Sequence, residues 1–517
     1  MITVPNNYRP FPVVRDVDFR IAFSVMDTNA KKDTTVITAS DTGVFNNARA
    51  TVNDVHEPTA GYIALERDLW RLDGSFSALP DDLDGIETGM WSEQISGSDC
   101  VFREPIVYRY TFPAPISTLG WTLTFDPKTH QRASKVRITA YAADGVTVID
   151  TGEYENDDDV MMLQHYVGDY YAVEFAFLST NEPMRRLRLT EVDFGLTKSY
   201  DRNALGSVKI VYGADILSRS LPMRELVFTF DNADKQYNLL NPDGVYQYLQ
   251  EGQEITASAV IGGVPVDMGV FRFTKADVSR SGIVPEITAH DAVYALDGSV
   301  FTGATGAEMT LSAAVSALLG GFDLPVRYEG NIGSRPVTLS PPADVSVREC
   351  VRLLAQAAMS AVYIERAGTL VFSDMAQADA PVSEITADEL YDYGGVSISD
   401  PVHGVKLHVT SGFEFDANGN PIRYTYTAGS LDVGAIVTSF QNPCVAKSAG
   451  ASVAAWLLAG LGRRKNYAVK NRCDPAVEIG DTIAAADIFG NFENAVVTGV
   501  EVNYDGTLYA VTKGVGQ

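Results

Sequence analysis

Apolar and polar residues alternate along most of this 517-residue chain, and this pattern constrains its fold more than any other feature. In "WTLTFD", Trp121, Leu123 and Phe125 fall on one side of an extended strand and threonines fall on the other. The segment "VEFAFL", at 173–178, repeats the pattern. A period of two residues is typical of a β-strand with one buried face. The chain is therefore predicted to be mainly β, with a smaller α/β part.

Turn residues separate these strands in the first part of the chain. In "KVRITAYAADGVTVID", at 135–150, two alternating runs flank Asp144 and Gly145, which is the pattern of a β-hairpin. Several short strands with turns between them are typical of a sandwich or jelly roll. We predict a sandwich or jelly roll across residues 50–198.

A helical segment interrupts the strands between 301 and 395. Thr310 is suited to cap one short helix, and Ser346 with Glu349 forms a capping-box pattern at the start of a second. After the second helix, "AVYIE" and "TLVFS" predict a hairpin around Arg366. The apolar positions expected on the buried helix faces are Leu311, Val315 and Leu318, then Val347, Val351, Leu354 and Ala358.

The rest of the chain again has strand patterns. The region 199–300 is predicted to form one β-barrel, and 396–517 a second one that includes an Ala-rich helix at 446–463. Glycine pairs with aspartate at two turns of the closing segment, Gly480-Asp481 and Asp505-Gly506. Because 517 residues are too many for one hydrophobic core, several domains are expected.

The charge balance bears on possible partners. Forty basic and sixty-six acidic residues give a net charge of −26, which disfavours stable binding to nucleic acid. The most apolar stretch, at 451–462, is too short to span a bilayer, and the N-terminus lacks a signal-peptide pattern, so we expect no membrane insertion. The four cysteines show no metal-ligand spacing and are expected to be reduced and buried: Cys100, Cys350, Cys444 and Cys473.

No motif in the sequence predicts catalysis, a cofactor site or a metal site. The elbow of hydrolases, the Walker loop and the zinc-protease motif are absent. In "FTFDNADKQYNLLNPDG", at 228–244, counting from Asp231 puts Ala233 and Gln236 where a calcium loop needs an oxygen ligand and a glycine. That stretch is predicted to be a strand followed by a turn. His403 and His408 are close in sequence but are expected to face opposite sides of a strand.

Four further segments have a functional and a structural interpretation, and the structural one is favoured for each. The acidic run "ENDDDV", Glu155 to Val160, is expected to be a solvated turn and not a calcium site. Three tryptophans that could stack on sugars are expected in the core: Trp70, Trp91 and Trp121. Arg186 and Arg188 are expected on a charged edge strand. The basic run at 463–465 suits a helix C-terminus.

Three sets of segments resemble the tail hub proteins of tailed phages. The first set is "YIALERDLWRLDGSF", "MWSEQIS", "YRYTFPAPISTLGWTLTFD" and "VDFGLTKS", which resembles the jelly-roll insertion near the start of many hubs and implies a galactose-binding-like sandwich at 50–198. The second set is "LPMRELVFTFDNADKQYNLLNPDG", "LQEGQEITASAVIGG", "MGVFRFTKADV" and "PEITAHDAVYALDG", which is similar to a first hub barrel. The third set is "SVRECVRLLAQAAMSAVYIERAGTLVFSD", "DPAVEIGDTI" and "VEVNYDGTLYAVTKGVG".

The resemblance implies a domain plan and an assembly. Residues 1–49 would join the first hub barrel at 199–300, with the jelly roll at 50–198 inserted between them, and an α/β hub domain at 301–395 would precede the second barrel at 396–517. The protein would be a homotrimer whose six barrels join the sixfold tail tube or distal tail ring to the threefold tip and line the DNA channel. Its other partners would be the tape measure protein and fibre or other tip proteins.

The resemblance also implies a location and a lack of enzyme activity. The protein would be assembled in the host bacterial cytoplasm and reside at the virion tail tip, with DNA present only in transit. Many hubs continue into a peptidase, a lysozyme or a fibre, and this sequence stops at Gln517, so cell-wall cleavage is not expected.

Two alternatives belong to other functional classes. One is a carbohydrate-binding adhesin component that binds a host surface glycan through the jelly roll. The other is a glycoside hydrolase, which would need two carboxylates facing each other across a cleft.

Overall fold

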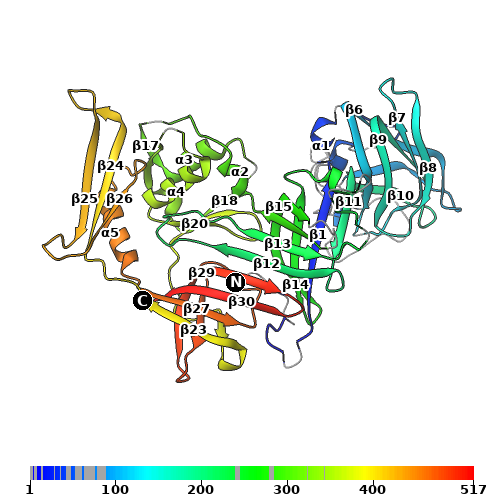
Figure 1. Cartoon of the computed structure of the whole chain (residues 1–517). Helices are drawn as coiled ribbons and strands as arrows, with labels where there is room; N and C mark the ends of the chain where they lie inside the picture. Colours follow the sequence, from blue (N-terminus) through cyan, green and yellow to red (C-terminus); the bar gives the residue numbers. More distant parts are fainter. Residues whose placement is uncertain are drawn as a thin grey trace. The chain divides into compact units, whose positions relative to one another are not determined.

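A computed structural model describes residues 4, 8–12, 15–27, 30–34, 36–41, 48–52, 61–62, 76–77, 89–127, 129–233, 235–238, 241, 245–278, 284–304, 306–322, 324–342 and 344–516. The chain forms two compact units. Unit 1 comprises 1–22, 199–241 and 254–517, and unit 2 comprises 23–198 and 242–253. Strands dominate both units, which confirms the prediction of a mainly β protein (Figure 1).

Unit 2 is built on one seven-stranded sheet. Its strand order is β5-β10-β6-β9-β7-β8, and β2 pairs with β6. The predicted hairpin is confirmed, because Lys135 to Tyr141 pairs antiparallel with Val148 to Glu155. The elements of this unit are α1 (Ala30–Asp33), β2 (Val36–Ala39), η1 (Ala48–Val52), β3 (Gly61–Tyr62), β4 (Phe76–Ser77), β5 (Met90–Ile95), β6 (Val101–Phe125), β7 (Ala133–Tyr141), β8 (Val148–Glu155), β9 (Val160–Thr180), β10 (Arg186–Asp193) and η2 (Val245–Tyr248).

Aromatic rings fill the core of unit 2. The alternation in "WTLTFD" places Trp121 and Phe125 in this core, both almost fully buried. Phe175 meets Trp121 edge-to-face, with ring centroids 6.2 Å apart. Such edge-to-face pairs add to the stabilisation that burial provides.

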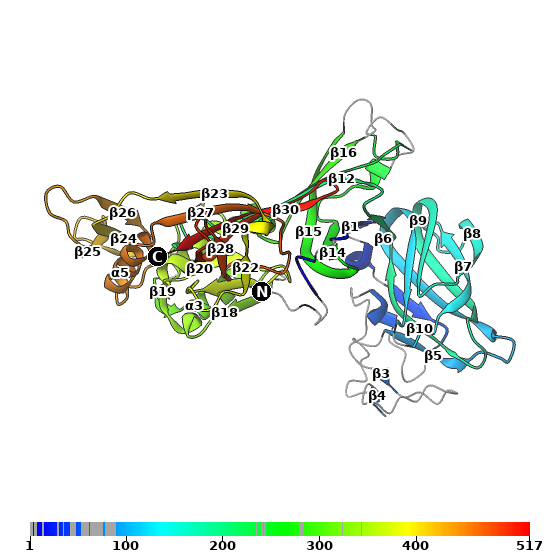
Figure 2. The same ribbon diagram turned by 90° about the horizontal axis from the view of Figure 1, so that it is seen from below.

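A large sheet, antiparallel except for the β22–β28 pair, runs through unit 1 (Figure 2). Its order is β11-β1-β14-β15-β16-β13-β12-β29-β30-β27-β23, and β22 and β28 branch from β29. The strands are β1 (Val17–Met26), β11 (Gly195–Tyr200), β12 (Leu205–Gly213), β13 (Glu225–Phe230), β14 (Glu254–Ile261), β15 (Val264–Val278), β16 (Pro285–His290), β22 (Ser383–Ile385), β23 (Leu390–Ile398), β27 (Lys465–Asn471), β28 (Thr482–Ala486), β29 (Phe492–Tyr504) and β30 (Leu508–Gly516). β1 and β11 each run from one unit into the other.

Distant parts of the sequence meet in this sheet. Val208 to Gly213 of β12 pairs antiparallel with Gly499 to Tyr504 of β29. The strands of 199–300 and the closing strands of the chain therefore share one hydrogen-bonded sheet.

The helical part of unit 1 packs as the sequence predicts. Thr310 caps α3 by accepting a hydrogen bond from the backbone N–H of Ala313, and Ser346 caps α4 in the same way through Glu349. The elements here are α2 (Val293–Asp297), β17 (Glu308–Thr310), α3 (Leu311–Leu319), β18 (Val326–Tyr328), η3 (Ile332–Ser334), β19 (Pro336–Thr338), α4 (Val347–Ala357), β20 (Ala361–Ile364), β21 (Leu370–Ser373), η4 (Ala387–Glu389), β24 (Gly404–Phe415), β25 (Pro421–Gly429), β26 (Val437–Gln441) and α5 (Gly450–Leu461).

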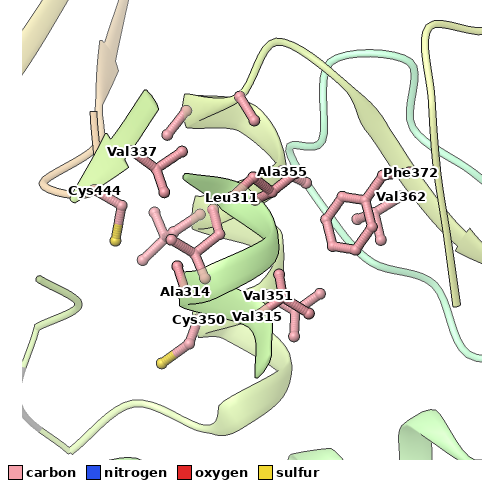
Figure 3. Close-up of a cluster of buried hydrophobic side chains, with 14 of the residues drawn as sticks. Leu311, Ala314, Val315, Val337, Cys350, Val351, Ala355, Val362, Phe372 and Cys444 are labelled. Carbon is pink, nitrogen blue, oxygen red and sulfur yellow. The ribbon is translucent and has the colours of Figure 1, made fainter. Parts of the chain in front are cut away.

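One apolar cluster joins these helices to the short strands beside them. Figure 3 shows Leu311 and Val315 of α3 close to Val351 of α4, with Val362 and Phe372 from the β20–β21 hairpin. All seven apolar positions predicted for the two helix faces are buried. The Ala-rich helix is α5, which begins four residues later than predicted and packs on β24 and β25. In the described part of the chain, no helix combines the length and the hydropathy needed to cross a bilayer.

Candidate assembly surface

The exposed face of the unit 1 sheet carries a row of charges. Strand pairing aligns one residue from each of six neighbouring strands: Glu254, Arg272, His290, Glu225, Val211 and Glu501. Arg272 Nη1 lies 2.9 Å from Glu254 Oε2, and Lys209 Nζ lies 3.0 Å from Glu501 Oε1. Because these pairs are partly exposed, each contributes only a few tenths of a kcal/mol to about 1 kcal/mol to stability. The charged side chains of these pairs keep this face of the sheet in contact with water.

The opposite face of the same strands is apolar. Ala289, Leu226 and Ile210 are aligned across β16, β13 and β12, and all three are fully buried. The period of two therefore places a packed core on one side of the sheet and a charged surface on the other.

The strand β23 ends this sheet with one open edge. In the described part of the chain its only partner is β27. Three of its apolar side chains are exposed, Tyr391 at 56%, Val396 at 62% and Ile398 at 65%. An exposed edge strand can pair with another chain.

An apolar hairpin tip follows β28. Ile488 is 68% exposed and Phe489 is 80% exposed. Asp487 holds the turn, because its Oδ1 accepts hydrogen bonds of 2.8 Å from the backbone N–H groups of both Phe489 and Asn491. Gly490 supplies the positive φ of +83° that this turn requires.

Contacts across β27 connect the tip to the open edge. Glu493, which follows Phe492 at the start of β29, accepts a hydrogen bond from the Tyr467 hydroxyl and lies 3.8 Å from Lys465 Nζ. Tyr467 and Lys465 are the strand partners of Val396 and Ile398. We name as the edge surface Val396, Ile398, Lys465, Tyr467, Ile488, Phe489, Phe492 and Glu493.

A buried arginine ties the helical part of unit 1 to the sheet. Arg366, at the β20–β21 turn, is 3% exposed and forms an ion pair with Glu478 through Nε. Its Nη2 donates to the Val477 carbonyl at 2.7 Å and to the Tyr212 hydroxyl at 3.0 Å. Burial raises the pKa of Tyr212 to about 12, so this hydroxyl stays protonated at neutral pH.

A pocket of about 630 Å³ lies beside Arg366, and half of the residues that line it are charged. The charges are already paired, because Arg327 Nη2 lies 2.6 Å from Glu365 Oε2 and Arg335 Nη2 lies 3.0 Å from Asp374 Oδ1. In the described residues, no group of three or more His, Cys, Asp or Glu side chains could hold a metal ion. Ion pairs within the chain therefore engage the charged side chains at the wall of this pocket.

Two tryptophans considered for sugar stacking are buried. Trp91 is 3% exposed and Trp121 is 1% exposed, so neither can stack on a ligand at the surface. The favoured interpretation, that they belong to the core, is confirmed for both. Trp70 lies outside the described residues.

The predicted edge strand around Arg186 and Arg188 is wrong. This strand, β10, lies between β5 and β6. Arg188 is 1% exposed, and its guanidinium carbon lies 3.7 Å from the centre of the Trp91 ring. Stacking on an aromatic ring allows the long basic side chain to be buried in an inner strand, which its charge alone does not predict.

The remaining acidic and histidine segments make contacts within the fold. Asp159 of the run at 155–160 pairs with Arg132 at 2.9 Å and also with His130. His403 accepts a hydrogen bond from the Ile436 N–H, and His408 pairs with the Thr425 hydroxyl, so the two imidazoles have separate partners.

The other segments singled out in the sequence also have structural contacts. Asp231 accepts a hydrogen bond from the backbone N–H of Ala233, which confirms a turn after β13. Arg463 and Arg464 donate to the carbonyls of Met375 and Ser399 after α5. All four cysteines are free, but Cys100 is only half-buried, so the expectation that every one is buried is wrong there.

The sequence did not predict the buried contacts of Arg366 or the apolar hairpin tip. Nothing in the local pattern around Arg366 shows that its side chain enters a core, because its partners lie more than 90 residues away. The turn at the hairpin tip had a usable signal, since Asp487-Ile-Phe-Gly-Asn repeats the spacing of Asp416-Ala-Asn-Gly-Asn.

Comparisons with known proteins find similar solved structures, whereas no family model and no curated protein matches the chain. A tail protein from Neisseria meningitidis MC58 is 11% identical, with a TM-score of 0.45 over 62% of this chain and 94% of that one. A 43 kDa tail protein of prophage MuSo2 from Shewanella oneidensis is 14% identical, with a TM-score of 0.43 over the same shares. Prophage tail protein gp18 from Listeria monocytogenes EGD-e is 12% identical, with a TM-score of 0.39 over 62% of this chain and 91% of that one.

Proposed function

We propose that this chain is a structural hub subunit of a phage tail tip or baseplate and has no enzyme activity of its own. Three copies would form a ring that joins the sixfold tail tube or distal tail ring to the threefold tip. The observation that carries the proposal is the unit 1 sheet, which has one packed face, one charged face and an open end strand at β23. Such an element is suited to form part of a wall between copies.

Ring geometry supports an assembly of identical chains. A closed ring requires each copy to present two flanks that complement each other. A permanent assembly of this kind buries roughly 2,000 to 5,000 Å² per interface. In the proposed domain plan, each subunit has one barrel at 199–300 and another at 396–517, so three subunits place six barrels in the ring. The 50–198 region adds a jelly roll to each subunit.

The charge of the sheet suits a wall past which DNA moves. The row on its exposed face contains three glutamates, Glu225, Glu254 and Glu501, beside Arg272 and His290. Paired charges with an acidic excess do not hold phosphate groups, whereas a basic lining would retain them. We propose that DNA is present only in transit.

The proposed neighbours are the other components of a tail tip. The hub would contact distal tail or tail tube proteins above it, the tape measure protein inside, and fibre or other tip proteins below. Its location would be the virion tail tip after assembly in the host cytoplasm.

Mass and images of the purified full chain test this proposal. We expect the mass of a trimer by light scattering, and rings with a central hole in negative stain. A monomer at micromolar concentration would overturn the ring. Release of product from cell-wall or polysaccharide substrates would overturn the structural role.

A further inference from the structure

We propose that the edge surface is the place where a second copy of this chain docks, and that a strand of this second copy pairs with β23. The inference rests on the proposed function, because it names the surface that joins neighbouring copies. Three observations carry it: the open backbone, the exposed apolar side chains and the local charge.

The backbone of β23 offers hydrogen-bonding groups along Gly395 to Ile398, where the strand pairs in regular register with β27, whereas the register shifts between Leu390 and Gly395. The strand has nine residues, Leu390 to Ile398, and in the described part of the chain it pairs only with β27. Folded proteins usually protect such an edge with a proline, an inward-pointing charge or a covering loop. β23 contains no proline, and Asp392 is its only charged residue. The regular part of the strand, Gly395 to Ile398, is therefore open to pairing with a strand from another molecule.

The side chains beside this edge favour burial by a protein partner. Val396, Ile398, Ile488 and Phe489 are between 62% and 80% exposed in the single chain. Covering each of them is favourable by about 25 cal/mol for every Å² of apolar surface removed from water. The tip is also fixed in advance, because Asp487 holds the turn that carries Ile488 and Phe489. A fixed turn reduces the entropy lost on docking.

Charge identifies the partner as another copy. The segment "RRKNYAVKNR", at 463–472, forms β27 and its flanks and contains five basic residues and no acidic one. The whole chain has a net charge of −26, so most of its surface repels a second copy. The basic strand next to the open edge attracts an acidic partner, and this chain is itself strongly acidic.

A pair of charge substitutions tests the proposal in the full-length protein. In the variant Val396→Asp with Ile398→Asp, an assembled edge would bury two carboxylates. We expect the self-association constant to fall by at least ~100-fold, because two apolar contacts are lost and charges take their place. Thermal stability of the single chain should change little, because both side chains are exposed before assembly.

Unit 2 provides a matched control. Val146 and Val148 have the same two-residue spacing as Val396 and Ile398. Val146 lies in the turn before β8 and is 78% exposed, and Val148 begins β8 and is 50% exposed. The variant Val146→Asp with Val148→Asp should keep the wild-type mass in light scattering. Loss of the oligomer in both variants would overturn the assignment of the surface to β23.

The outcomes separate the two proposals. If the wild type is an oligomer and the β23 variant has the same mass, the docking inference is wrong while the ring remains. If the wild type is a monomer, both proposals are wrong. If the variant fails to fold, hydrogen exchange of the wild type tests the inference instead. The amides of 395–398 should gain protection as protein concentration rises, and unchanged exchange on assembly would overturn the inference.

Discussion

Individual buried polar residues hold the parts of unit 1 together. Arg366 donates hydrogen bonds to the carbonyls of Asp267 and Val477 while it pairs with Glu478. An ion pair taken out of water is costly unless the remaining polar atoms also find partners, and the carbonyls around this guanidinium provide them. Its role is therefore to fix the β20–β21 hairpin on the sheet.

Removing this guanidinium should destabilise the fold strongly. Arg366→Ala leaves Glu478 buried without its cation, and we expect a loss of about 3 to 5 kcal/mol in the free energy of unfolding. Replacing Arg366 and Glu478 together by Met should recover part of the loss. The matched control is Arg272→Ala, which breaks an exposed pair and should cost less than about 1 kcal/mol. Urea unfolding followed by fluorescence measures all three, and equal losses for Arg366→Ala and Arg272→Ala would contradict the prediction.

Asp291 gives unit 1 a pH dependence with a definite sign. It is 2% exposed and accepts hydrogen bonds from the backbone N–H groups of Arg224 and Val293. Burial raises the pKa of this carboxyl from 3.8 to about 6. An acid whose pKa is higher in the folded state destabilises the fold as pH rises from the unfolded to the folded value. The contribution lost between pH 4 and pH 6 is on the order of 3 kcal/mol.

The variant Asp291→Asn isolates this contribution, because an amide does not titrate. The stability of the wild type relative to the variant should therefore fall as pH rises from 4.5 to 7.5. Thermal unfolding of both proteins at several pH values gives the comparison. A stability difference that is independent of pH would show that Asp291 is ionised throughout this range.

The cysteines should differ in reactivity for the same physical reason. Burial raises the pKa of Cys350 to about 11 and of Cys444 and Cys473 to about 12. At pH 8 these thiols are protonated and shielded, whereas Cys100 is half-buried. We expect one fast-reacting thiol per native chain with an aromatic disulfide reagent, and four in denaturant. The variant Cys100→Ser should abolish the fast phase, and its persistence would contradict this assignment.

At the scale of elements, local pattern predicts most of what forms. The caps at Thr310 and Ser346 were predictable because capping depends on residues three positions apart. In a full capping box the Glu349 carboxylate would also accept a hydrogen bond from the backbone N–H of Ser346. This half was less predictable, since the Glu349 carboxylate pairs with Arg352. The inner position of β10 was missed because its Arg188 is buried by stacking on Trp91. This partner is 97 residues earlier in the sequence, so local pattern does not reveal it.

Two hairpins share one turn design. Asp416 and Asp487 each accept hydrogen bonds from the backbone N–H groups two and four residues later. These bonds lower the pKa of both carboxyls. The same sequence spacing, Asp-x-x-Gly-Asn, therefore forms the same turn in two different sheets.

The turn prediction follows from these hydrogen bonds. Asp487→Ala should loosen the tip that carries Ile488 and Phe489, so its amides should exchange hydrogen faster while β28 and β29 remain intact. The equivalent change Asp416→Ala should loosen only the β24–β25 tip. Each variant serves as the control for the other, and faster exchange at both tips in either variant would mean that the turns are not independent.

At the scale of the whole molecule, sequence pattern gives the class of fold but not its connections. Alternation shows that a segment is a strand with one buried face, and it does not identify the neighbouring strand. The pairing of β12 with β29 joins Val208 to Tyr504, nearly three hundred residues away. The edge surface depends on such pairings, because β23 is exposed only by being last in the sheet. The candidate surface could therefore be found only from the fold.

The net charge leads to a prediction for the complete chain and DNA. Since the net charge is −26 and the exposed row of the sheet is mostly paired, we expect no retention of duplex DNA in a gel-shift assay at low salt. The triple substitution Glu225→Lys, Glu254→Lys and Glu501→Lys would convert the row into a basic strip beside Lys209 and Arg272. That variant should retain DNA in a salt-sensitive way, because each phosphate contact releases counterions. Salt-sensitive binding by the wild type would show that its basic residues already form a site for DNA. The proposal that DNA passes the sheet without being held would then be wrong.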